Sequence, residues 1–80
     1  MEGQKEVLIY TTPTCQYCVK AKSFFNDNNI WYQEFNVAVD IEKRREMVEK
    51  SGQMGVPVIS INKEIVIGFD ENKFRELLEL

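Results

Sequence analysis

Two cysteines, Cys15 and Cys18, are the residues of this chain best suited to chemistry, and they are its only cysteines. They stand three positions apart in the stretch PTCQYC, and no histidine occurs among the 80 residues. Two thiols at this spacing can form a working redox pair, a structural disulfide or half of a metal site. The rest of the sequence has to decide among these three possibilities.

Composition and charge indicate the class of protein and the cellular compartment to which the two thiols belong. The balance of 44% hydrophobic and 29% charged residues is that of an ordinary folded protein, and 80 residues suffice for one domain, which we expect to span residues 1–80. Apolar runs such as Val7–Ile9 are far shorter than the roughly 20 residues of a membrane helix. The charged start, residues 1–6, leads into no signal-peptide stretch, so we expect a cytoplasmic protein without membrane contact. A net charge of −3 argues against nucleic acid as a partner.

The expected cytoplasmic location favours the redox pair over the structural disulfide. Structural disulfides are rare in a reducing cytoplasm, whereas catalytic and redox cysteines are common there. Two cysteines without histidine cannot supply the four ligands of a structural zinc ion, so we expect no metal. An inert cysteine pair and a metal site shared between subunits remain as minor alternatives.

The elements that must position the cysteines follow from runs of strand-like and helical residues. Strands are predicted where β-prone residues cluster, at 6–10, 30–35, 57–61 and 64–67. Helices are predicted where apolar residues recur at three and four positions, from residue 15 to the asparagine-rich stretch at 26–29, from Asp40 to about Lys50, and from Asp70 onward. The middle helix has few apolar contacts (Ile41, Met47 and Val48), so it should lie half exposed.

Local signals support these boundaries. Asp40 and Asp70 suit the helix N-cap, and Phe69 and Phe74 stand at the two positions of a hydrophobic staple around Asp70. Asn62-Lys63 between two β-prone runs predicts a hairpin. The order is therefore β-α-β-α-β-β-α. A strand-helix-strand unit implies a parallel pair with a right-handed crossover, so we predict a four-stranded mixed sheet with helices on both faces.

The start of the first helix makes the two cysteines unequal. With Thr14 as N-cap, Cys15 lies in the first turn, where backbone N–H groups of Tyr17 and Cys18 lack helical partners and can point at its sulfur. These amides and the helix dipole favour a thiolate, and thiols in such places have pKa values of about 3.5–7.5. Cys18 lies one turn deeper, so we predict Cys15 as the nucleophile and Cys18 as the resolving thiol. Such a thiol needs no base, so the absence of histidine excludes a papain-like hydrolase but not thiol–disulfide exchange.

Three segments resemble the glutaredoxin and glutaredoxin-like family in its minimal thioredoxin fold: IYTTPTCQYC at 9–18, GVPVISI at 55–61 and IGFD at 67–70. The resemblance covers essentially the whole chain. It implies that Val56-Pro57 is a cis-proline element facing the dithiol. A trans proline opening an edge strand is the alternative that the residues alone leave open.

The same resemblance implies glutathione as redox co-substrate, with no tightly bound cofactor, and client protein disulfides as partners of a monomeric enzyme. Val56 would hold the cysteinyl backbone of glutathione, and the Gly68-Phe69-Asp70 turn would receive its γ-glutamyl end. Tyr17 would line the cleft, or is simply a partly exposed aromatic. Gln53 would reach the glycine carboxylate, or is an ordinary loop residue. Asp70 also serves as a plain helix cap.

The chain departs from the family pattern at three places. Gln16 replaces a common proline, which leaves the redox potential open, and Thr12 replaces a common lysine that would assist the thiolate and bind a glutathione carboxylate. Lys20 or Lys22 could compensate, although exposed helix lysines usually serve solubility. Phe69 is bulkier than the glycine or cysteine common before the last helix.

Three functions therefore compete. The first is a glutathione-dependent dithiol oxidoreductase that reduces protein disulfides and removes glutathione from proteins. The second is a redoxin recharged by thioredoxin reductase, for example as electron donor to ribonucleotide reductase, favoured by Thr12. The third is an iron–sulfur carrier that bridges two chains through Cys15 and glutathione.

Overall fold

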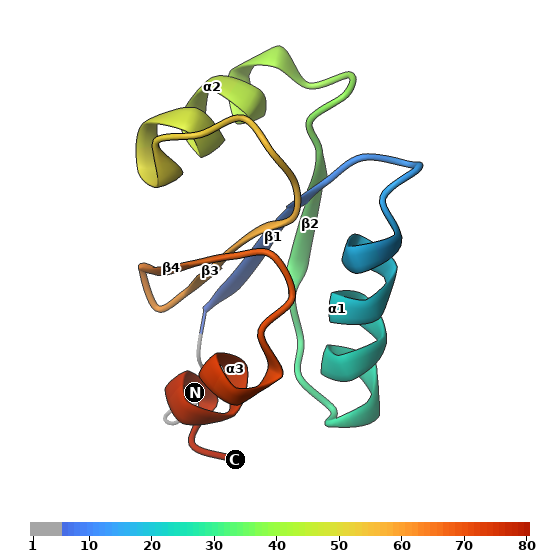
Figure 1. Ribbon diagram of the computed structural model, residues 1–80, viewed down its shortest axis with the longest axis vertical. Coiled ribbons are helices and arrows are strands. Elements are labelled where there is room, and N and C mark those ends of the chain that lie inside the picture. The colour runs from blue at the N-terminus through green and yellow to red at the C-terminus, as the bar shows by residue number, and fades with distance from the viewer. Residues whose placement is uncertain (1–5) are drawn as a thin grey trace.

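The computed structural model describes residues 6–80, so the predicted N-terminal features at residues 1–5 lie outside it. Seven elements follow one another in the predicted order β-α-β-α-β-β-α (Figure 1). They are β1 (Val7–Thr11), α1 (Gln16–Asp27), β2 (Gln33–Asn36), α2 (Ile41–Ser51), β3 (Val58–Ile61), β4 (Glu64–Ile67) and α3 (Glu71–Leu78). The prediction of one domain over the whole chain remains a prediction.

The four strands form one mixed sheet in the order β2-β1-β3-β4. β1 and β2 run parallel because α1 carries the chain back across the sheet between them, whereas β3 runs antiparallel to both β1 and β4. The turn between β3 and β4 consists of Asn62 and Lys63, both with positive φ, as a two-residue hairpin requires. The predicted minimal thioredoxin fold is confirmed.

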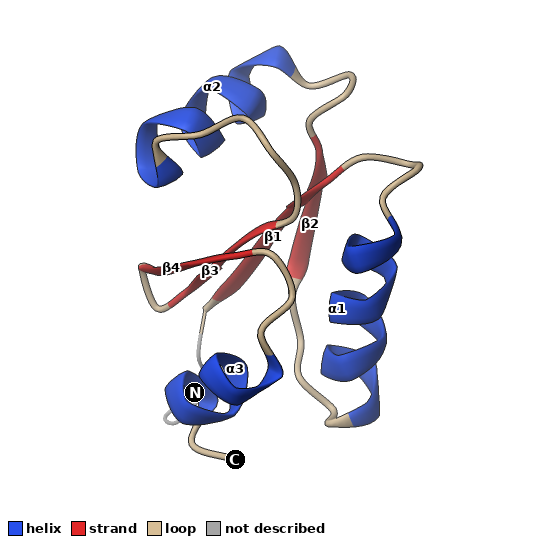
Figure 2. Ribbon diagram, viewed as in Figure 1, coloured by secondary structure: helices blue, strands red, loops and turns tan. Residues whose placement is uncertain are grey.

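Helices cover both faces of the sheet, as the view coloured by secondary structure shows (Figure 2). Alternate residues of β1 point to opposite faces. Val7 and Ile9 belong to a core with residues of α1 and α3, in which the rings of Phe25 and Phe74 lie 5.1 Å apart. Tyr10 belongs to the core on the other face, where it meets Met47 of α2. No helix among residues 6–80 is long and apolar enough to cross a membrane.

Two predicted N-caps are confirmed, and they determine where α2 and α3 begin. Asp40 accepts a hydrogen bond from the Lys43 N–H at 3.1 Å, and Asp70 accepts one from the Lys73 N–H at 3.2 Å. The predicted staple is also present, since the Phe69 and Phe74 rings lie 5.7 Å apart.

Several predicted boundaries were wrong by one to three residues. β1 runs one residue later than predicted, β3 begins at Val58 and not Pro57, and β2 begins at Gln33 and not at Ile30. The pairing partner decides these limits: β2 starts where Gln33 meets Leu8, while the Ile30 N–H donates to Phe25 at the end of α1. Ile41, predicted as an apolar contact of α2, is 67% exposed, because only the Met47 side of this helix faces the sheet.

Candidate active site

The cysteine pair lies at the edge of the sheet where β1 ends. Thr11 closes β1, and a short loop then leads to Cys15, whose N–H donates to the Thr12 carbonyl at 3.4 Å. Val58 pairs with Tyr10, so Pro57, the residue before Val58, lies at this same edge. The Gly68 N–H donates to the Pro57 carbonyl at 2.9 Å, which adds the turn after β4. The fold therefore brings three separate predicted segments to one edge.

Cys15 is itself the N-cap of α1, which corrects the predicted cap at Thr14. Its backbone is extended, and its Sγ accepts a hydrogen bond from the Cys18 N–H at 3.1 Å. The sulfur takes this position because the preceding turn at Thr12 places the helix start one residue later than Thr14 requires. The hydrogen bond predicted from Cys18 is thus present, and an N–H donor stabilises negative charge on the sulfur that accepts it.

Cys18 lies in a very different environment, since it is only 1% exposed, whereas Cys15 is partly exposed. Burial, followed by the hydrogen bond with Cys15, raises the pKa of Cys18 to about 12, while the Thr12 backbone and the Lys22 charge oppose this rise. Both cysteines are free thiols. At neutral pH the buried sulfur therefore remains protonated, and the partly exposed one is the sulfur that an incoming disulfide can reach.

The predicted ligand-binding residues differ in backbone conformation, burial and hydrogen bonding. The Val56-Pro57 peptide is cis, as the resemblance implied, with Pro57 buried and Val56 half-buried. Gly68 has φ +83°, a conformation that suits glycine. Gln53 turns back on its own loop, where its Nε2 donates to the Gly55 carbonyl at 3.3 Å.

The remaining predicted residues have exposed or half-buried side chains. Gln16 and Tyr17 are exposed in the first turn of α1, and Thr12 is half-buried in the loop before it. Phe69 is half-buried and packs edge-on against Phe74. The roles of these residues toward a ligand stay predictions.

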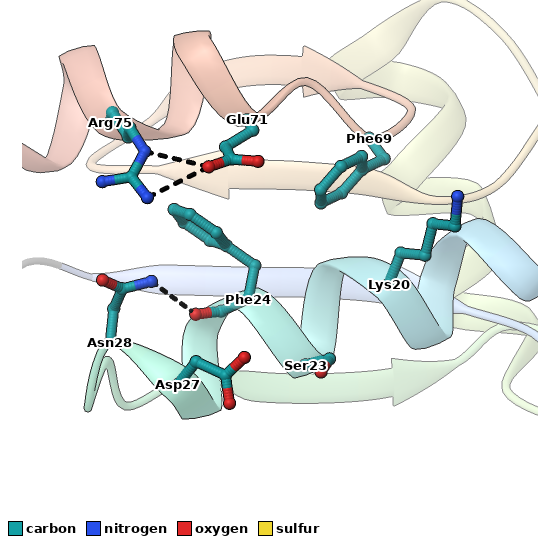
Figure 3. Close-up of a pocket in the computed structure, with 8 residues that line it drawn as sticks. All are labelled: Lys20, Ser23, Phe24, Asp27, Asn28, Phe69, Glu71 and Arg75. Atoms are coloured by element: carbon teal, nitrogen blue, oxygen red, sulfur yellow. Dashed lines mark hydrogen bonds and ion pairs between the residues drawn. The ribbon is translucent and has the colours of Figure 1, made fainter.

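A groove of about 470 Å³ runs between α1 and α3, and sequence reasoning did not anticipate it. Lys20 and Phe69 lie at one end, toward the start of α1, while Arg75 and Asn28 lie at the other (Figure 3). Arg75 pairs with Glu71 at 3.0 Å and its guanidinium lies over the Phe24 ring. No sequence signal could reveal this groove, because its walls come from helices about 50 residues apart in the chain.

A polar network on the Cys18 side of α1 was also missed. Lys22 Nζ lies 2.9 Å from Glu34 Oε2, and the hydroxyl of the buried Thr11 donates to the same carboxylate oxygen at 2.8 Å. Burial raises the pKa of Glu34, but the hydrogen bonds from Lys22 and Thr11 outweigh it, so that this pKa falls below its ordinary value. The hydrogen bond to Glu34 raises the pKa of Lys22. The one available signal was the i,i+4 spacing of Cys18 and Lys22.

The chemistry that this arrangement allows is thiol–disulfide exchange. Among residues 6–80, no cluster of three cysteine, histidine or carboxylate side chains could hold a metal ion. A sheet edge that carries a helix-capping cysteine, a buried partner cysteine and a cis proline defines a thiol–disulfide oxidoreductase of the thioredoxin fold.

Comparison with known proteins narrows this class. The sequence profile described as Glutaredoxin matches residues 7–66. A glutaredoxin-like 8.6 kDa protein from the rubredoxin operon of Clostridium pasteurianum is 42% identical over 91% of this chain and 97% of its own length. Glutaredoxin 3 of Escherichia coli is 37% identical over 81% of this chain and 78% of its own. The crystal structure of the thioredoxin-like protein BC3987 superposes with a TM-score of 0.85 at 33% identity, covering 90% of this chain and 99% of that one. The chain belongs to the glutaredoxin family.

Proposed function

We propose that this glutaredoxin-type enzyme is a dithiol oxidoreductase that uses glutathione as its reductant. Cys15 attacks a protein disulfide or a glutathione mixed disulfide, and Cys18 or a second glutathione molecule resolves the product. The observation that carries this proposal is the contrast between the two sulfurs. Cys15 is partly exposed and accepts an N–H, whereas Cys18 is 1% exposed and protonated. A reducing cytoplasm would keep both as thiols.

The cleft for glutathione would lie along the sheet edge described above. The Val56 backbone would pair with the cysteinyl part of the ligand as a short strand does, with Pro57 beneath it. The N-terminus of α3 at Gly68-Phe69-Asp70 would receive the γ-glutamyl carboxylate, because helix N-termini attract anions, and Asp70 would accept from the ligand ammonium. Tyr17 would form part of the wall.

Two further residues bear on affinity and redox potential. The side-chain amide of Gln53 turns back to its own loop and donates to the Gly55 carbonyl, so we assign it a minor part in ligand binding. Thr12 supplies no charge where many relatives have lysine, so glutathione should bind less tightly than in those relatives. Gln16 keeps an N–H in the active-site loop that proline would remove.

The test is turnover of a glutathionylated peptide with glutathione, glutathione reductase and NADPH. Wild-type protein should turn over, Cys15→Ser should be inactive, and Cys18→Ser should retain removal of glutathione while losing reduction of protein disulfides. Turnover by Cys15→Ser would refute the assignment of the nucleophile. No turnover by wild-type protein would refute the use of glutathione.

Thr12 supports a second candidate, in which thioredoxin reductase recharges the protein, for example for delivery of electrons to ribonucleotide reductase. The oxidised protein should be offered glutathione and thioredoxin reductase side by side. Rapid reduction by the reductase with no reduction by glutathione would favour the second candidate over the first.

A further inference from the structure

Resolution by Cys18 presents an electrostatic problem. To resolve a mixed disulfide, Cys18 must lose its proton and attack the Cys15 sulfur, yet it is 1% exposed and hardly solvated. Burial raises its pKa to about 12, which leaves very little thiolate at neutral pH. A positive charge near Cys18 would favour the thiolate as it forms.

Lys22 is the cation placed to supply that charge. It follows Cys18 by four residues on α1, so the two side chains lie on the same face of the helix. Its charge lowers the pKa of Cys18, although burial outweighs this effect. The side chain is 29% exposed, so water screens it less than a free surface lysine.

The position of Lys22 is fixed from two other elements. Glu34 of β2 holds the ammonium at 2.9 Å, and the same carboxylate oxygen accepts the hydroxyl of Thr11 at 2.8 Å. Thr11 is 2% exposed at the end of β1, so this anchor is part of the sheet. The titratable groups around Cys18 and Lys22 are Cys15 from α1, Glu34 from β2 and Tyr32 from the segment before β2.

We propose that Lys22, anchored by Glu34, stabilises the Cys18 thiolate and so sets the rate at which this protein resolves its mixed disulfides. The proposal rests on the dithiol mechanism proposed above. In this step the Cys18 sulfur gives up its proton to solvent and attacks the Cys15 sulfur. The Cys15–Cys18 bond forms, the bond between Cys15 and the client sulfur breaks, and the client leaves as a thiolate that takes up a proton. Lys22 acts through Cys18 and exchanges no atoms.

If charge is what matters, substitution of Lys22 should slow resolution whereas substitution of Glu34 should not. Lys22→Gln removes the cation that favours the thiolate, so resolution slows. Glu34→Gln keeps an oxygen that can accept from Lys22 and Thr11 but removes the negative charge that offsets the cation, so resolution is unchanged or faster. A purely structural ion pair would instead make both variants slow, because both lose the same charge–charge contact.

The experiment is stopped-flow oxidation of the reduced protein by 2,2′-dithiodipyridine, an uncharged disulfide that releases one coloured thiopyridone on attack by Cys15 and a second on resolution by Cys18. Lys22→Gln should slow the second phase by about threefold to tenfold at neutral pH and leave the first unchanged. The ratio of the wild-type rate to the Lys22→Gln rate should stay constant from neutral pH to about pH 10, because Cys18 remains mostly protonated in both proteins and Lys22, whose pKa lies above 10.5, keeps its charge. Lys73→Gln, the same change on the exposed surface of α3, is the matched control and should alter neither phase.

Different results of this experiment would refute the role of Lys22 or the role of Cys18. A second phase unchanged in Lys22→Gln, equal slowing in Lys22→Gln and Glu34→Gln, or equal slowing of both phases would each overturn the role of Lys22. The Cys18→Ser variant should release one thiopyridone, and release of two would refute Cys18 as the resolving thiol. Because the assay contains no glutathione, failure of the glutathione proposal leaves its outcome unaffected.

Discussion

The difference in burial between the two cysteines predicts a large difference in their reactivity toward an alkylating agent. Raising the pKa of Cys18 from 9.0 to about 12 reduces its thiolate population at neutral pH about a thousandfold. A more basic thiolate is also more nucleophilic, which at a Brønsted slope of about 0.4–0.5 restores a factor of about 20. Cys18 of the folded protein should therefore react about 50-fold more slowly than a cysteine in the unfolded chain. Its exposure of 1% makes this a lower limit.

The assay is a time course with iodoacetamide at neutral pH, followed by peptide mass mapping of each cysteine. The folded protein should carry one label, on Cys15, while the chain in denaturant should carry two. The Cys15→Ser variant removes a neighbouring thiol but leaves the larger effect, burial, in place, so most of the protection of Cys18 should persist. Labelling of Cys18 at nearly the same rate in folded and unfolded protein would refute the reasoning.

Four further predictions concern stability and reductant choice. Phe74→Ala should lower the free energy of unfolding by about 3–5 kcal/mol, because the ring is fully buried, and a loss in urea denaturation well below this range would contradict its place in the core. Gly68→Ala should lower the free energy of unfolding by about 1–2 kcal/mol. This cost comes from the backbone φ of +83° alone, because a Cβ at this position would meet no neighbouring atom. An unchanged urea midpoint would contradict this. Tyr10→Phe removes the hydrogen bond to Glu46, which lowers the pKa of that carboxyl in the folded state, so about 1 kcal/mol should be lost at neutral pH. Because the pKa of Glu46 is lower in the folded state than its ordinary value of 4.5, this contribution to the free energy of unfolding is fully present above pH 4.5 and is lost as the pH falls below 4.5 through the folded-state pKa. The difference in stability between wild type and Tyr10→Phe should therefore shrink below pH 4.5, and a constant difference would contradict this. Thr12→Lys should raise kcat/KM for glutathione several-fold and leave the rate of reduction by thioredoxin reductase unchanged. An equal change in both rates would argue against a glutathione carboxylate near residue 12.

The order of elements could be predicted because the signals are local. The caps at Asp40 and Asp70 each need only an N–H three residues along the chain, and the Asn62-Lys63 hairpin needs only its own two residues. The position of the cysteine pair at the start of the first helix follows from the same kind of signal. The cap itself was misplaced by one residue, because the chain turns at Thr12 and α1 then begins at Cys15, whose sulfur accepts the Cys18 N–H.

Tertiary structure alone decided the features that depend on partners distant in the chain. The start of β2 is set by pairing with β1, and the exposure of Ile41 is set by the side of α2 that meets the sheet. The anchoring of Lys22 by Glu34 joins a helix to a strand that packs beside it.

The sequence by itself determined which residues could do chemistry and that a helix begins at them, since residue type and short-range periodicity suffice for both. Only the fold decided how unequal the two sulfurs are. Solvation and nearby charge determine the protonation of a thiol, and both come from the residues that surround it in space. The burial of Cys18 and the charge of Lys22 beside it therefore became visible only once β1, β2 and α1 were packed together.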